Sequence, residues 1–307
     1  MRVVFMGSAE FAIPTLAELA QQHEVIAVVT QPDRPAGRGR RPKASPAKQF
    51  AGQHGMKVIE PDSLRAPEAI GQLASLRPEL IVVAAYGQIL PQAVLDLPHH
   101  GCLNVHASLL PRWRGASPVQ AAILHGDSET GVSIMLMEVG LDTGPIVAQR
   151  STPIAAGETG GGLTDRLARL GAGLMIEALP AYMAGTLRPA AQDEAQATHA
   201  PRLRKASGQL DLRLPAAQLE RQVRAYEPWP GSFIRWNGRR LIVRLARAEA
   251  LDRAIPGQAI ELERRPALGT ADGALVLERV QPEGKRAMDG QAFLLGSPEF
   301  LNACLLG

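Results

Sequence analysis

An amide and an imidazole lie two residues apart at the end of a short apolar run, in Leu103-Asn-Val-His-Ala-Ser-Leu-Leu-Pro111. Successive side chains of a strand point to opposite faces, so Asn104 and His106 are predicted to project from the same face. A pair of this kind can hold a reacting carbonyl oxygen and move a proton beside it. The spacing therefore predicts a site that can act on a carbonyl group.

A carboxylate in a glycine-bounded loop, Gly140-Leu-Asp-Thr-Gly144, completes the set. The two glycines let this loop turn tightly, and a carboxylate beside an imidazole fixes its tautomer. We predict that Asn104 and His106 stabilise an oxyanion, and that Asp142 orients His106 and assists proton transfer. Taken singly, a histidine at a strand end is more often structural, and an aspartate in such a loop is more often a turn former. The surrounding motif favours the catalytic interpretation.

Three other kinds of site are less well supported. Ser108 could belong to a Ser-His-Asp hydrolase, but the Gly-x-Ser-x-Gly context is absent, so it is interpreted as a turn or ligand-contact residue. Cys102 could be a nucleophile, although a small buried residue at a strand start is the commoner case. The other histidines form no metal-ligand pattern, and we predict no metal.

Apolar runs at 2–6, 25–30, 57–59, 80–85 and 101–105 alternate with helical patterns. Continuous apolar strands separated by helices predict a parallel sheet covered on both faces, in a Rossmann-like α/β domain. Ligands bind beyond the carboxyl ends of such strands, where Asn104 and His106 lie. The turn at 7–11 lacks the G-x-G-x-x-G pattern, so an ordinary turn is favoured over a dinucleotide site.

The C-terminal part has a different pattern. Asn237-Gly238 and Asp272-Gly273 each separate two strand-like runs, which predicts hairpins in a small β-rich domain. A further strand is expected at 132–138 and an amphipathic helix at 164–184. We expect a catalytic domain at 1–189, a linker at 190–207 and a C-terminal domain at 208–307.

Composition limits the class of protein. The chain has 307 residues, of which 46% are hydrophobic and 21% charged, and its formal net charge is +3. It contains two cysteines far apart, which implies no disulfide framework and fits a reducing cytoplasm. No apolar run reaches the roughly 18 residues that span a bilayer. We expect a cytoplasmic protein, a monomer, without a membrane partner.

Basic residues gather in two places. The stretch from Gln31 to Lys48 contains Arg38, Arg40, Arg41 and Lys43, and its prolines and glycines exclude a regular helix. Such a loop could bind a phosphate backbone or be a solvated surface loop. The second group starts at Arg202 and interleaves arginines with aromatic residues. We assign its arginines to phosphate contact and most of its aromatic residues to packing.

Segments along nearly the whole chain resemble the methionyl-tRNA formyltransferases, a branch of the 10-formyltetrahydrofolate-dependent formyltransferases. The matching segments are 30–39, 83–91, 103–118, 139–144, 216–221, 228–230 and 284–288. One departure is Ala206-Ser207 after Lys205, where the family usually has acidic residues.

The resemblance implies a Rossmann-like catalytic domain followed by an OB-fold-like β-barrel. It implies transfer of the formyl group of 10-formyltetrahydrofolate to the amino group of methionyl initiator tRNA, for translation initiation. The catalytic residues carried over are Asn104, His106 and Asp142. Folate contacts fall on Ser108, Leu109, Leu110, Pro111, Tyr86 and Gly87, and tRNA contacts on Arg38, Arg40, Arg41, Lys43 and Lys205.

Two alternatives remain. A formyltransferase acting on an amino sugar nucleotide or on glycinamide ribonucleotide would share the three catalytic residues, but it has no evident need for an arginine-rich loop. A non-catalytic RNA-binding protein on a decayed enzyme fold would have no reason to keep all three.

Overall fold

The computed structural model describes residues 1–36 and 41–305. The chain forms two units, each discontinuous in sequence. Unit 1 comprises Met1–Pro118, Thr130–Pro153 and Thr164–Ala200, and unit 2 comprises Val119–Glu129, Ile154–Leu163 and Pro201–Gly307. The boundaries expected at 189 and 207 stay a prediction.

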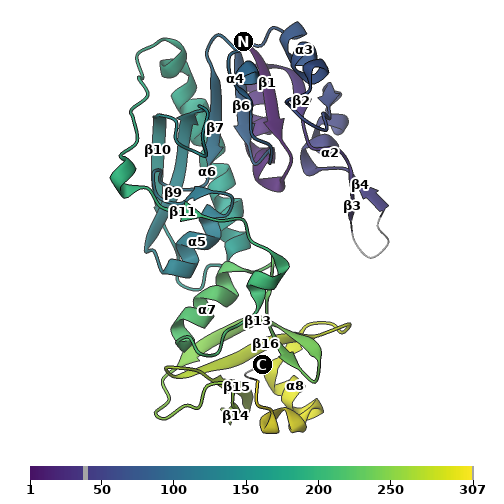
Figure 1. Cartoon of the computed structure of the whole chain (residues 1–307), viewed down its shortest axis with the longest axis vertical. Helices are drawn as coiled ribbons and strands as arrows, with labels where there is room; N and C mark the ends of the chain where they lie inside the picture. Colours follow the sequence, from purple (N-terminus) through teal and green to yellow (C-terminus); the bar gives the residue numbers. More distant parts are fainter. Residues whose placement is uncertain (37–40, 306–307) are drawn as a thin grey trace. The chain divides into compact units, whose positions relative to one another are not determined.

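Unit 1 is built on a seven-stranded sheet in the order β10-β9-β7-β6-β1-β2-β5 (Figure 1). The strands are β1 (Arg2–Gly7), β2 (Glu24–Val29), β5 (Val58–Ile59), β6 (Leu80–Ala84), β7 (Cys102–His106), β9 (Glu129–Leu136) and β10 (Ile146–Pro153). Each of the five strands expected up to His106 is present.

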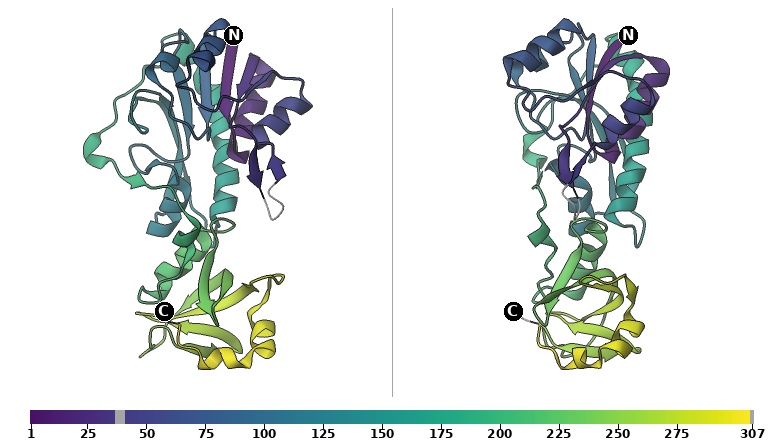
Figure 2. Two further views of the ribbon diagram at one scale, coloured as in Figure 1. Left: turned by 45° about the vertical axis from the view of Figure 1, so that its right-hand side comes forward. Right: turned by 90° about the vertical axis from the view of Figure 1, so that its right-hand side faces the viewer.

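Helices cover both faces of this sheet, as the two views of Figure 2 show. They are α1 (Ile13–Gln22), α2 (Pro46–Gln53), α3 (Pro67–Ser75), α4 (Gln92–Leu95) and α6 (Gly160–Met183), whereas α5 (Pro118–His125) belongs almost wholly to unit 2. Gly171 of α6 lies against Val105 and Val132 on one face. Leu73 of α3 and Val94 of α4 join the buried cluster on the other face. Strands buried on both sides explain the continuous apolar runs of the sequence.

The five strands for which the sequence predicts a parallel sheet are parallel to one another, but the whole sheet is mixed. Strand β9 runs antiparallel to β7, with His106 opposite Ser133 and Leu103 opposite Leu136. Because β9 is buried along most of its length, its apolar run looks the same in either direction. Hydrophobic pattern alone therefore could not reveal the reversal.

Two small pairings complete unit 1. Strands β3 (Arg34–Ala36) and β4 (Arg41–Lys43) form an antiparallel hairpin within the basic stretch. Strands β8 (Arg114–Gly115) and β11 (His199–Ala200) pair in parallel, which anchors the middle of the expected linker within unit 1.

Unit 2 contains an antiparallel sheet in the order β12-β13-β16-β15-β14, with β17 beside β16. Its elements are α7 (Ala216–Ala225), β12 (Ser232–Trp236), β13 (Arg239–Glu249), β14 (Ala259–Leu262), β15 (Arg265–Gly269), β16 (Ala274–Pro282), β17 (Met288–Asp289) and α8 (Gly290–Gly296). Both expected hairpins are present. Within the described residues the strand pairing closes no barrel, so the OB-fold-like barrel is not confirmed.

Candidate active site

Strand β7 carries two of the candidate catalytic side chains. Asn104 pairs with Val83 of β6 and Met135 of β9, which places it in the middle of the sheet. His106 is the last residue of the strand and is 6% exposed. Since the backbone is extended, both side chains leave the same face, opposite to the face of Val105.

The ring of His106 is held from two sides. Its Nε2 lies 3.1 Å from the carbonyl oxygen of Trp113. That oxygen can only accept, so Nε2 carries the proton in this contact. The Nδ1 atom lies 3.7 Å from Oδ2 of Asp142, whose side chain is 13% exposed. The structure thus brings together the imidazole and the carboxylate that the sequence places 36 residues apart.

Asp142 lies in a loop whose two ends are joined by a backbone hydrogen bond. The amide of Leu136 donates to the carbonyl oxygen of Pro145 at 2.9 Å, which joins the two ends of residues 137–144. A Cβ at Gly144 would lie 1.9 Å from the carbonyl oxygen of Leu136, so only glycine permits this close approach. The carboxylate of Asp142 also accepts from the amide of Gly115 at 2.8 Å.

The segment 190–200, which the sequence presents as linker, is bound to this site. We call it the strap. Its Gln192 donates to the carbonyl oxygens of Asp142 and Gly144 at 2.8 and 2.7 Å. Its Glu194 forms a two-point ion pair with Arg114, a guanidinium that is only 2% exposed. Hydrogen bonds from Arg114 lower the pKa of Glu194. Sequence reasoning missed these residues because a polar segment without periodicity reads as a linker.

The candidate folate residues 108–111 form a turn held by many hydrogen bonds. Ser108 is fully buried, and its hydroxyl donates to the carbonyl oxygen of Arg112 at 2.6 Å. Ser133 of β9 donates to the Ser108 carbonyl and accepts from the Leu110 amide. Leu110 is buried, while Leu109 and Pro111 are partly exposed. The buried hydroxyl fits the turn role of Ser108, and folate contact by the turn stays a prediction.

Tyr86 and Gly87 follow the carboxyl end of β6. Tyr86 is 2% exposed and belongs to the core cluster, and burial raises the pKa of its hydroxyl to about 12. Gly87 is exposed, with a φ of 87°. Its position beyond the strand end is where α/β sheets bind ligands.

The two cysteines have different environments. Cys102 is 1% exposed, and burial raises the pKa of its thiol to about 12. A protonated thiol in the core is a poor nucleophile, which agrees with a packing role. Cys304 of unit 2 is exposed.

The candidate tRNA residues are only partly described. Arg38 and Arg40 lie outside the described residues, and of Arg41 only the backbone is described. Lys43 and Lys205 are exposed. Lys48 is bound to Asp33 and Glu60, both at 2.9 Å, so its charge is already balanced.

Many arginines of unit 2 are likewise paired. Arg244 binds Glu227, and Arg247 binds three glutamates. Arg235 and Arg240 instead lie directly opposite each other on β12 and β13, beside Arg239. Like charges directly opposite each other on two strands repel one another, and the nearby carboxylate of Glu283 accepts from the backbone amide of Arg240 at 3.2 Å. Within the described chain, no ion pair involves Lys205, Arg235 or Arg239.

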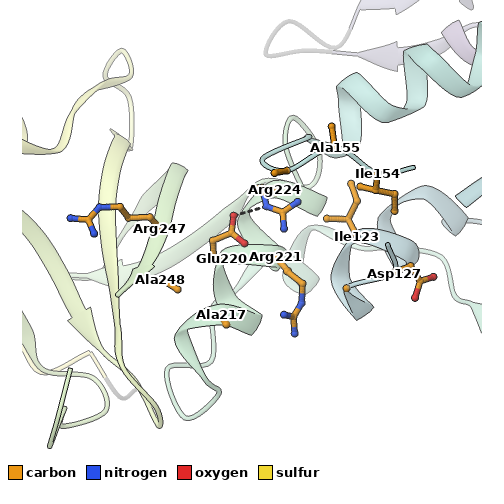
Figure 3. A pocket seen from close by; sticks show the side chains of 12 residues that line it. Ile123, Asp127, Ile154, Ala155, Ala217, Glu220, Arg221, Arg224, Arg247 and Ala248 are labelled. Atoms are coloured by element: carbon orange, nitrogen blue, oxygen red, sulfur yellow. Dashed lines mark hydrogen bonds and ion pairs between the residues drawn. The ribbon is translucent and has the colours of Figure 1, made fainter. Parts of the chain in front are cut away.

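A cavity of about 500 Å³ lies in unit 2. Figure 3 shows Glu220 and Arg224 of α7 pointing toward each other at this cavity. Arg221 donates to the carbonyl oxygen of Leu124. The hydrogen-bonding groups of these side chains are mainly used by neighbouring protein groups. The residues that line the cavity include none of the candidate catalytic residues. Among the described residues, no group of histidine, cysteine and carboxylate side chains could hold a metal ion.

The arrangement at β7 can support transfer of a carbonyl-type group to an amine. Asn104 and His106 share the face on which an oxyanion would develop, and Asp142 lies beside the imidazole.

Comparisons with known proteins narrow the range of reactions that this site could catalyse. Residues 1–179 match the formyl transferase family and residues 202–298 its C-terminal domain. A methionyl-tRNA formyltransferase of Ectopseudomonas mendocina (strain ymp) is 49% identical over 100% of this chain and 98% of its own.

The chain belongs to the methionyl-tRNA formyltransferase family. Solved structures show the same fold at lower identity. An N-formyltransferase from Helicobacter canadensis, in complex with folinic acid and dTDP-3-aminofucose, has a TM-score of 0.68 at 18% identity, covering 91% of this chain and 98% of that one.

HypX from Aquifex aeolicus, in complex with tetrahydrofolic acid, has a TM-score of 0.66 at 19% identity. The alignment covers 98% of this chain and 47% of HypX, so the present chain spans about half the length of that protein. In the described part of the chain, no helix is long and apolar enough to cross a membrane.

Proposed function

We propose that this protein transfers the formyl group of 10-formyltetrahydrofolate to the free amino group of methionyl initiator tRNA. The observation that carries the assignment is the 49% identity to a methionyl-tRNA formyltransferase across the full chain. The contact between His106 and Asp142 supports it, because it assembles groups that this chemistry requires.

In the proposed mechanism, the amine of the methionyl group attacks the formyl carbon and forms a C–N bond. Asn104 and His106 stabilise the oxyanion of the tetrahedral intermediate. The bond from the formyl carbon to N10 of the folate then breaks, and the proton lost by the amine moves to that nitrogen. Asp142 holds the ring of His106 and assists this proton movement.

We further propose where the two substrates bind. The folate would lie beyond the carboxyl ends of β6 and β7, against Gly87 and the turn 108–111. The acceptor end of the tRNA would meet the basic stretch around β3 and β4. The free cations Lys205, Arg235 and Arg239 would contact phosphates, on a C-terminal sheet that we take as OB-fold-like. We still expect the protein to be cytoplasmic and monomeric.

The test is a transfer assay with 10-formyltetrahydrofolate and three acceptors offered separately. The acceptors are methionyl initiator tRNA, a dTDP-amino sugar and glycinamide ribonucleotide. Formylation of the charged tRNA alone is expected. Formylation of the sugar nucleotide or of the ribonucleotide in its place would select the alternative formyltransferase. Binding of tRNA without transfer would instead select a non-catalytic RNA-binding protein.

A further inference from the structure

We propose that Gln192 is a positioning residue for the transfer reaction, which holds the Asp142 loop in the conformation that presents the carboxylate to His106. The inference rests on the proposed function, because it assigns Asp142 a part in formyl transfer. Gln192 belongs to the strap, 50 residues from Asp142 in sequence.

The amide of Gln192 uses both of its ends. Its Nε2 donates to two carbonyl oxygens of the same loop, those of Asp142 at 2.8 Å and Gly144 at 2.7 Å. Its Oε1 accepts from Nε and Nη2 of Arg114 at 3.0 and 2.8 Å. Because a guanidinium can only donate, it determines which end of the amide faces the loop.

Arg114 is itself anchored. Its guanidinium is buried and also binds Glu194, two residues after Gln192. The hydrogen bonds that Arg114 donates to Glu194, and the charge of that carboxylate, raise the pKa of Arg114, so the cation is permanent. The strap and Arg114 therefore form a fixed frame against which Gln192 holds the loop.

The loop needs such a frame because Asp142 has an unusual backbone. Its φ is 56°, in the left-handed region that residues other than glycine seldom adopt. A conformation of this kind persists only when its surroundings enforce it. The bond from Gly115 restrains the carboxylate, whereas Gln192 restrains the backbone that carries it.

The decisive variant is Gln192→Glu. It keeps the size of the side chain and the acceptor for Arg114, but it places a carboxylate oxygen against two carbonyl oxygens. We expect kcat to fall by about 10- to 100-fold, as a displaced catalytic group does. The KM values for 10-formyltetrahydrofolate and methionyl-tRNA should change by less than about 3-fold, because no substrate contact is lost.

The matched control is Gln196→Glu, the same change four residues further along the strap. Gln196 is exposed, and its amide donates to Asp193 rather than to the loop. This variant should keep the kcat of the wild type. If Gln192→Glu does not fold, Gln192→Met fills similar space without a charge, and the same loss of kcat is expected.

A double variant separates positioning from general destabilisation. If Gln192 acts through Asp142, adding Gln192→Glu to Asp142→Asn should lower kcat by less than about 2-fold further. Losses that multiply, or a Gln192→Glu protein with the kcat of the wild type, would overturn the inference.

Hydrogen exchange gives a readout that does not depend on the substrate. The amide of Gly115 is bonded to the Asp142 carboxylate, so it should exchange faster in Gln192→Glu than in Gln196→Glu. Equal exchange in both variants would refute the role of Gln192. A wild type that does not formylate methionyl-tRNA would refute the proposed function instead, and the exchange result would still stand.

Discussion

At the residue scale, His106 is oriented by partners from two different segments. The carbonyl oxygen of Trp113 holds Nε2, and the carboxylate of Asp142 lies next to Nδ1. The ring therefore has one preferred placement before any substrate arrives. Such preorganisation lowers the reorganisation needed when charge develops on the substrate.

We expect His106→Ala and Asn104→Ala each to lower kcat by about 10²–10³, the usual cost of losing an oxyanion donor. Binding of 10-formyltetrahydrofolate should change little, because the turn 108–111 is held by Ser133 rather than by these side chains. Steady-state formyl transfer and equilibrium folate binding measure the two effects. Near-normal turnover of either variant would remove that residue from the mechanism.

Asp142→Asn isolates the charge of the carboxylate. Asparagine tolerates a φ of 56° and its amide oxygen can still accept from Gly115, so the loop should keep its shape. We expect kcat to fall by at least about 10²-fold, since the imidazole loses its charged partner. Thermal unfolding serves as the control. A variant with full activity and a lowered Tm would show that Asp142 serves only the fold of the loop.

The candidate reacting groups could be predicted from the sequence, but the residues that hold them in place could not. Asn104 and His106 are readable because a strand has a period of two residues. The placement of Asp142 next to His106 depends on a left-handed residue, a glycine in close contact and a strap. Arg114, Gln192 and Ser133 act through long-range hydrogen bonds, which leave no periodic trace in a single sequence.

At the element scale, β7 lies between β6, to which it runs parallel, and β9, to which it runs antiparallel. One face of β7 packs against α6. The contact with α6 is close, because Gly171 leaves room for Val105. Because Val105 directly precedes His106, α6 packs against β7 next to the candidate catalytic histidine. Two glycines of α6, Gly171 and Gly173, face different surroundings and make a matched pair.

Gly171→Ala should destabilise the protein by about 1–3 kcal/mol, the usual cost of overpacking a core. A Cβ there would lie 2.6 Å from Cγ1 of Val105 and 3.1 Å from Cγ1 of Val132. Gly173→Ala meets nothing within 4 Å and should stabilise by about 0.5–1 kcal/mol through helix propensity. Urea unfolding measures both. Equal effects of the two substitutions would contradict the packing described for α6.

Six strands of the main sheet and the long helix α6 follow from the sequence, because buried strands and amphipathic helices have distinct patterns. The direction of β9 and the short strands β8 and β11 do not. Two-residue strands such as β11 bury too few side chains to leave a pattern. They form because Arg114 and Ala116 donate to carbonyl groups of the strap.

At the scale of the whole molecule, charge is distributed less simply than the count of arginines indicates. Paired arginines such as Arg213, which binds Asp211 at 2.8 Å, add little net positive charge at the surface. Lys205 and Arg239 are exposed without an ion pair in the described chain. They are better candidates for phosphate contact than the paired side chains.

Lys205→Ala and Arg239→Ala should each weaken tRNA binding and reduce the slope of log K against log salt by about 1 or slightly less. Arg213→Ala removes the same formal charge from a paired position and should leave the slope unchanged. Filter binding over a salt series gives the slopes. Identical slopes for all three variants would show that phosphate contacts lie elsewhere, for example on Arg41 or Lys43.

The discontinuity of the two units has a consequence for how such proteins can be recombined. The chain passes between units at residues 119, 130, 154, 164 and 201. Helix α7 consequently depends on early segments, since Arg221 donates to Leu124 and Arg224 to the carbonyl oxygen of Glu158. A single crossover near residue 201 would give α7 foreign partners. Hybrids with a relative should therefore inherit 119–129 and 154–163 together with the C-terminal part.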